Sequence, residues 1–292
     1  MYSRDETIDA VLRLYRQVIK HPYINDNVLI LPPLNGWDSI NIQGKNGTVL
    51  DLLHHLPYLH LEKPYERLLI HWETIPICYS DPNSLNTQEE VYPLPAHCVY
   101  LTHSLDREGI SLILDTHEGT ISEFSNTGSH IVVPYEEYEA LPESENWKAH
   151  RTTPVIELLD SWTRKYENLI WMLVPNTISQ PTTGRFYSRA ESSVEEDELL
   201  QQGQLEPWHP EDDDSYAQNY DQESEFDRSW RETRIRAKRH AADVYNTYLR
   251  YGWPDHFDKD RCRVELLELE RTKDAEDRRL MDEANPDAAL FD

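Results

Sequence analysis

Residues 111–124 read Ser111-Leu112-Ile113-Leu114-Asp115-Thr116-His117-Glu118-Gly119-Thr120-Ile121-Ser122-Glu123-Phe124, and this stretch decides the fold. A run of aliphatic residues ends at Asp115, and a second run, in which apolar and polar side chains partly alternate, begins at Thr120. Between the two runs, Gly119 can adopt the positive φ that a type I turn with a bulge requires. The stretch therefore predicts an antiparallel β-hairpin.

Further strands and helices are expected on both sides of this hairpin. Short runs rich in branched and aromatic residues predict strands at 67–72 and 97–101. Ser3 and Glu6 have the spacing of a capping box, and Thr48 and Thr153 are the expected caps of two later helices. Apolar residues recur every three or four positions after each of these caps. Two helices before the strands and one after them predict an α+β fold, with a single, largely antiparallel sheet and flanking helices.

Charge is distributed unevenly along the chain. The 292 residues include 54 acids and 28 bases, so the formal net charge is 28 − 54 = −26. From Glu191 to Asp227 there are fourteen acidic and no basic residues. Such a stretch cannot bury enough apolar surface to offset the entropy lost on ordering, so 178–227 is expected to be a disordered acidic linker. The expected domains are a body at 1–177, this linker, and a C-terminal pair of helices at 228–292.

The composition also limits the partners of the chain. A strong negative charge opposes general binding to nucleic acid or to an anionic membrane surface, and no apolar run approaches the ~20 residues of a membrane-spanning helix. Residues 228–250 carry seven bases against two acids, and the acidic linker is expected to mask this basic helix. Three widely spaced cysteines and an N-terminus without an apolar signal region predict a reducing compartment, the cytoplasm or also the nucleus.

Motifs with a defined chemistry are missing from the sequence. It contains no HExxH, CxxC or Gly-x-Ser-x-Gly string and no glycine-rich cofactor loop. We therefore predict no metal, no cofactor and no catalytic residue. The alternative is an enzyme, or an accessory protein of a specialised metabolic pathway, with a pocket formed by His71, Glu73, Asp115 and His117. Residues two positions apart on a strand share a face, so each His could act with its neighbouring carboxylate as a proton-transfer couple.

Aromatic residues provide the candidate binding surface. The chain has eight Trp and seventeen Tyr, many of them in proline-rich loops. Partly buried Trp and Tyr are preferred at binding surfaces because they combine a large apolar area with a polar group. Trp37, Tyr58 and Trp147 are the predicted binding residues, and the predicted partner is another protein.

Three local strings resemble the SUKH superfamily, an α+β group that includes bacterial toxin-immunity proteins and the fungal regulator of cell-wall glucan synthesis. They are DLLHHLPY at 51–58, which is similar to a segment of uncharacterised fungal members, the hairpin at 111–124, and VIELLDSW at 155–162. The resemblance covers about residues 5–170. The usual Asn-Gly-Gly turn is absent, the nearest string being Asn35-Gly36-Trp37. The resemblance implies a non-catalytic, intracellular protein-interaction or regulatory module and transfers no catalytic residue.

Overall fold

The predicted hairpin lies at the centre of the largest sheet of the molecule. The computed structural model describes residues 2–40, 42–63, 66–81, 92–177, 182–203, 205–210 and 224–284. The hairpin consists of β6 (Ile110–Asp115) and β7 (Thr120–Ser125), which pair antiparallel with Leu114 opposite Ile121. A four-stranded sheet of order β4-β6-β7-β8 results when β4 (Cys98–Tyr100) and β8 (Thr152–Pro154) pair with its two edges. The hairpin prediction is therefore confirmed.

The remaining strands form three two-stranded sheets. These sheets pair β1 (Leu29–Ile30) with β2 (Tyr58–Leu59), β3 (Thr74–Pro76) with β5 (Thr102–Ser104), and β9 (Trp171–Pro175) with β10 (Gly184–Ser188). The α+β class and the antiparallel pairing are confirmed, whereas the expectation of a single sheet was wrong.

Hydroxyl side chains explain why β5 and β6 lie side by side without a continuous backbone ladder. The Thr102 hydroxyl donates to the Ile110 carbonyl (3.1 Å) and accepts from the Leu112 N–H (2.9 Å). The Ile110 N–H donates to the Thr74 hydroxyl at 2.9 Å, and the Ser104 N–H to the Ser111 hydroxyl at 3.1 Å. Side chains thus take the place of backbone partners, which hydrophobic periodicity does not reveal.

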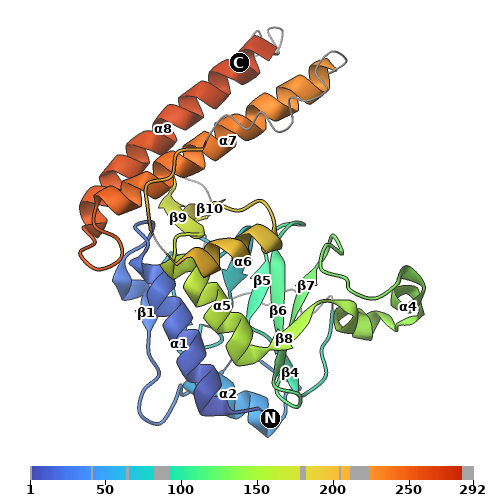
Figure 1. The fold of residues 1–292 in the computed structure, drawn as a ribbon. Helices are drawn as coiled ribbons and strands as arrows, with labels where there is room; N and C mark the ends of the chain where they lie inside the picture. Colours follow the sequence, from blue (N-terminus) through green and yellow to red (C-terminus); the bar gives the residue numbers. More distant parts are fainter. Residues whose placement is uncertain are drawn as a thin grey trace.

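Helices cover this sheet region on one side (Figure 1). The contacting pair is α1 (Arg4–Lys20) and α5 (Val155–Glu167), and α2 (Gly47–His55) follows the first loop. Shorter elements are η1 (Asp26–Val28), α4 (Tyr135–Ala140), η2 (Glu143–Ala149) and α6 (Ser193–Gln202). Ser3 caps α1 as expected, because its hydroxyl accepts from the Glu6 N–H at 3.5 Å.

The cap of α2 is Asn46 and not the expected Thr48. The Asn46 side-chain oxygen accepts from the Val49 N–H at 2.9 Å, while Thr48 is an exposed residue inside the helix. Replacing Asn46 with alanine is therefore expected to lower the free energy of unfolding by about 1 kcal/mol, because a terminal N–H loses its partner. Thr48→Ala is the matched control and is expected to change it by less than about 0.5 kcal/mol. Urea unfolding of both variants tests this, and equal losses would contradict the Asn46 cap.

Two long helices form the C-terminal arm and project beyond the body (Figure 1). They are α7 (Glu225–Arg250) and α8 (Lys259–Ala284). A second apolar core joins the arm to β9, where Met172 and Val174 meet Val244, Tyr248 and Leu266. β9 thus joins the body to the arm, because its alternate residues Trp171 and Leu173 belong to the main core. None of the described helices has the length and hydropathy that crossing a bilayer requires.

Part of the expected disordered linker, 178–227, is ordered. Residues 184–188 form β10, and residues 193–202 form α6 with Ser192 as its N-cap. Composition misled the prediction because β10 gains its backbone partners from β9, and α6 gains an ion pair between Glu196 and Lys165 of α5. The other parts of the expected linker include 178–181, 204 and 211–223, which lie outside the described residues.

Candidate functional site

The four residues of the alternative catalytic pocket do not converge. The Glu73 carboxylate accepts from the Glu108 N–H at 3.0 Å, just before β6 begins, whereas Asp115 is the last residue of β6. The two carboxylates therefore lie at opposite ends of β6. Glu73 has a φ of 46° in a tight turn where the His71 carbonyl accepts from the Thr74 N–H at 3.1 Å, so it is not on a strand face shared with His71.

His71 is enclosed by aromatic rings instead of facing a carboxylate. Its ring centroid lies 5.0 Å from Trp162 and 4.5 Å from both Trp171 and Phe186. Burial lowers the pKa of His71 to about 3, so the ring is neutral at physiological pH. Its Nδ1 has no hydrogen-bond partner among the described residues. His71, Trp162, Trp171 and Phe186 together form an aromatic cluster.

The aromatic cluster lies in a cleft of about 630 Å³. The cleft is bounded by α5, α6 and β7, together with β9 and β10. Its lining includes five carboxylates, which are Glu123, Glu157, Glu191, Glu196 and Asp197. Only two bases, Arg151 and Lys165, accompany them. With the histidines neutral, the lining side chains therefore carry a net charge of 2 − 5 = −3.

Both bases of the cleft are already paired with carboxylates. Arg151 donates to Glu123 (Nη2 to Oε1, 2.8 Å), and Lys165 donates to Glu196 (Nζ to Oε2, 2.7 Å). The Trp171 indole N–H donates to the other Glu196 oxygen at 2.6 Å, and the Lys165 ammonium lies 4.5 Å from the centroid of that indole. Glu123 and Glu196 are therefore held as ion pairs and are poorly suited to proton transfer.

The predicted binding residues lie elsewhere. The Trp37 indole N–H donates to the Leu56 carbonyl at 2.8 Å, and its ring lies 5.8 Å from that of buried Tyr58. Trp147 is buried in η2. Within the described chain, none of the three lines the cleft. Trp37 and Tyr58 anchor the loops around α2, and their role in binding stays a prediction.

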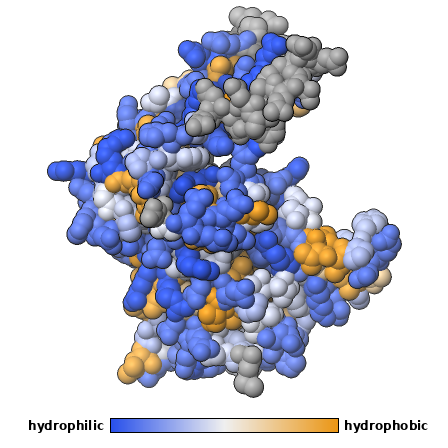
Figure 2. Space-filling model, in the orientation of Figure 1, coloured by the Kyte–Doolittle hydropathy of each residue, from blue (hydrophilic) through white to orange (hydrophobic). Residues whose placement is uncertain are grey.

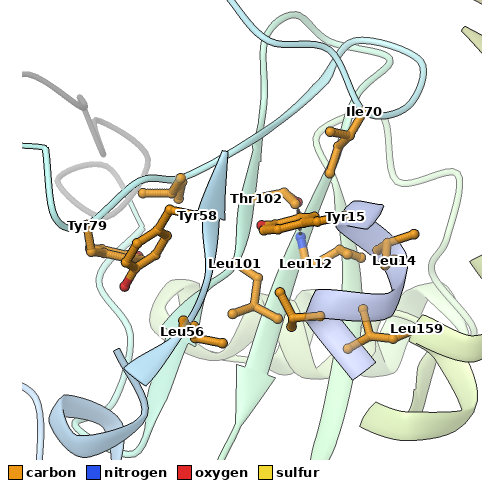
Figure 3. A pocket seen from close by; sticks show the side chains of 12 residues that line it. Leu14, Tyr15, Leu56, Tyr58, Ile70, Tyr79, Leu101, Thr102, Leu112 and Leu159 are labelled. Atoms are coloured by element: carbon orange, nitrogen blue, oxygen red, sulfur yellow. Dashed lines mark hydrogen bonds between the residues drawn. The ribbon is translucent and has the colours of Figure 1, made fainter. Parts of the chain in front are cut away.

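A second cavity lies inside the main core, between α1 and the strands (Figure 3). Its side chains are apolar or aromatic apart from Thr102, and Tyr15, Tyr58 and Leu112 are among them (Figure 3). The volume of about 20 Å³ is close to what one water molecule occupies. Such a void is a packing gap, too small for a ligand.

Asp115 and His117 do lie near each other, but in a turn. One Asp115 oxygen accepts from the His117 N–H (2.8 Å) and from the Glu118 N–H (3.1 Å), which fixes the hairpin turn. The other oxygen lies 3.8 Å from Nε2 of His97, and the Cys98 thiol is close to both groups. Burial, and secondarily the Asp115 charge, raises the pKa of that thiol to about 12. Cys98 is therefore a protonated thiol and no activated nucleophile.

The cleft could not be predicted from a motif. Its walls come from residues 71 to 197, and only folding brings them together. The amphipathic pattern of 155–169 did mark Trp162 as a buried residue, but the acidic composition of 191–197 concealed α6, which forms the opposite wall.

Comparison with protein-family models, with curated proteins and with solved structures found no match to this chain. The resemblance to the SUKH superfamily therefore stays a prediction.

Proposed function

We propose that the protein is a non-catalytic interaction module whose cleft binds an extended, positively charged segment of a partner protein. The observation that carries the proposal is the combination of the aromatic cluster with an excess of three carboxylates in one cleft of about 630 Å³. This volume lies within the range of roughly 300–1,000 Å³ that is typical of ligand sites. The proposal agrees with the function that the SUKH resemblance implies, and we place the module in the cytoplasm or nucleus.

The surroundings of Lys165 support the proposal that a cation binds in the cleft. Its ammonium already combines a carboxylate contact with Glu196 and a position over the Trp171 ring. A lysine or arginine of a partner is expected to meet carboxylates and the partly exposed ring of Phe186 in the cleft, because aromatic faces and carboxylates both attract cations. Glu157 and Asp197 line the cleft as exposed carboxylates, and neither has a hydrogen bond or ion pair with a described residue. They are the expected contacts of the partner's bases.

The apolar part of the ligand is expected to contact the rim of the cleft, at residues that precede α4 in the chain. Ile131 and Val132 line the cleft, and Val132 is 65% exposed. Hydrophobic side chains gather beside α4 on a face that is otherwise mostly hydrophilic (Figure 2). A segment that alternates basic and large apolar residues would match both the acidic and the apolar parts of this surface.

Arg234 shows that the acidic stretch can bind a basic side chain of the same protein. It lies on α7 and forms an ion pair with Glu191, a residue of the cleft rim. This is one contact of the kind that masking of the basic helix requires, so we do not propose binding to nucleic acid.

Reversing the charge of Glu157 is expected to weaken binding of a cationic peptide about tenfold, a loss of about 1.4 kcal/mol. The probe is a fluorescein-labelled peptide in which lysine or arginine alternates with leucine or tryptophan. The variant Glu157→Lys is compared with Glu167→Lys, which makes the same charge change at an exposed position of the same helix, outside the cleft. Fluorescence polarisation on the full chain measures both dissociation constants.

The two variants separate site binding from attraction to an acidic protein. We expect Glu167→Lys to bind the peptide like the wild type. Equal weakening in both variants would contradict the cleft as the binding site. Binding of a charge-inverted peptide, with glutamate in place of each base, at the affinity of the cationic one would contradict a positively charged partner.

A further inference from the structure

Three different donor side chains meet where β4 begins and β6 ends. His97, Cys98 and Asp115 each direct one ligand atom to a common region, and these atoms all lie within 4.8 Å of one another. Nε2 of His97 is 3.8 Å from the Asp115 oxygen that does not bind the turn N–H groups. Cys98 and Asp115 are register partners in the β4–β6 ladder, so their side chains share a face of the sheet.

The backbone around this group is held in place by other contacts. The His97 carbonyl accepts from both the N–H (3.0 Å) and the hydroxyl (2.8 Å) of Thr116. The two turn N–H groups bound to one Asp115 oxygen leave the second oxygen directed at His97. Hydrogen bonds of this kind orient the side chains that bind the ion in metal sites. Cys98 is fully buried, so its position is fixed by the core.

His117 lies beside this group and is the candidate for a fourth donor. Its ring centroid is 5.9 Å from that of His97, and its side chain is 77% exposed. Nδ1 of His117 contacts the Glu118 carboxylate at 2.9 Å, which leaves Nε2 available. A histidine held by a carboxylate through one nitrogen and by a metal through the other is a common arrangement.

We propose that His97, Cys98 and Asp115 bind a divalent transition-metal ion, with zinc as the preferred ion and His117 as the fourth ligand. Zinc accepts nitrogen, sulfur and oxygen donors in a tetrahedral arrangement, whereas calcium and magnesium require oxygen donors. Zinc–ligand bonds of about 2.0–2.3 Å separate tetrahedral donors by roughly 3.3–3.8 Å. Coordination replaces the proton of the Cys98 thiol with the metal ion and releases that proton to solvent.

The site is tested on the full chain with the metal ions themselves. We expect elemental analysis of protein purified without chelators to show about one zinc per chain, and apoprotein to take up one Zn²⁺ in a calorimetric titration. Substitution with Co²⁺ is expected to give the tetrahedral visible spectrum together with a thiolate-to-cobalt charge-transfer band. Failure to bind Zn²⁺, or a cobalt spectrum without the thiolate band, would overturn the proposal.

Matched variants assign the ligands. Asp115→Asn keeps an oxygen for the two turn N–H groups but loses the charge of the carboxylate, so we expect Zn²⁺ affinity to fall at least about tenfold with folding retained. Asp51→Asn alters another carboxylate near a histidine, 3.4 Å from His55, and is expected to bind Zn²⁺ like the wild type. Cys98→Ser should abolish the thiolate band while Cys78→Ser retains it. Loss of the band in both, or none in either, would contradict Cys98 as the sulfur ligand.

Discussion

Replacing Arg185 with alanine is expected to lower the free energy of unfolding by about 3–5 kcal/mol, because the change leaves buried carboxylates without their cation. Arg185 extends from β10 to α8, where its Nη1 lies 2.6 Å from Glu270 and 2.7 Å from Asp274. Its Nη2 donates to the second Asp274 oxygen at 3.0 Å. The Glu270 side chain is fully buried, and that of Asp274 is 20% exposed.

Other side chains also contact Glu270 and Asp274, but they cannot replace the charge of Arg185. Glu270 also accepts from the Tyr187 hydroxyl at 3.0 Å, and it lies 2.7 Å from Nε2 of His240. Burial alone would raise the pKa of Asp274, but hydrogen bonds from Arg185 and Thr177 hold it below its usual value. In the alanine variant the attraction to Arg185 is lost while the burial remains.

The loss is expected to appear first where the arm meets the body. Hydrogen exchange in α8 and proteolysis near residues 270–274 should increase at denaturant concentrations that leave the main sheet folded. The control is Arg250→Ala, whose ion pair with Glu265 is 58% exposed on the arginine side and is expected to contribute less than about 1 kcal/mol. Equal, small losses in both variants would contradict the view that the ion pairs of Arg185 with Glu270 and Asp274 stabilise the contact between the arm and the body.

Local signals were sufficient to predict the elements that stabilise themselves through nearby residues. The hairpin at 111–124 carries its own turn geometry, with Gly119 at a φ of 74°. Helix α1 carries its own cap at Ser3. Both were predicted correctly because strand pairing and capping here involve residues close in sequence.

Distant partners account for what the sequence could not show. β10 and α6 depend on β9 and on Lys165, and the Arg185–Glu270 pair spans 85 positions. The composition of an acidic segment gives its charge, but it does not identify the basic residues that folding brings next to it. The group of His97, Cys98 and Asp115 was missed for a similar reason, since two residues at the start of β4 and the last residue of β6 form no recognisable spacing in the sequence.

Two enclosed histidines, His21 and His71, are expected to make the protein sensitive to mild acid. Burial lowers the pKa of His21 and of His71 to about 3 each. His21 is fully buried, with Nδ1 2.8 Å from the Tyr248 hydroxyl, and His71 belongs to the aromatic cluster. In the unfolded chain both are expected to titrate near their ordinary pKa of about 6.5. Between these two values only the unfolded state takes up the protons, so stability falls as the pH falls.

The size of this effect follows from proton linkage. Above a pH of about 6.5 both states are neutral at these positions and contribute no pH dependence. Below it, each histidine lowers the free energy of unfolding by about 1.4 kcal/mol per pH unit, or about 2 kcal/mol at pH 5, until the folded state is protonated near pH 3. Asp274, whose pKa is held low by Arg185 and Thr177, adds its own loss at lower pH, and this loss is common to the wild type and to any histidine variant.

Replacing His71 with phenylalanine isolates one of these contributions. The new ring fits among Trp162, Trp171 and Phe186 but takes up no proton, so we expect the variant to gain about 2 kcal/mol relative to the wild type between pH 7.5 and pH 5. His256→Gln, at an exposed position, is the control and should follow the wild type at both values. Urea unfolding at both pH values gives the difference in free energy of unfolding between each of the two variants and the wild type. Parallel pH dependences for His71→Phe and the wild type would mean that His71 titrates alike in the folded and unfolded states, which a ring enclosed by three aromatic side chains should not do.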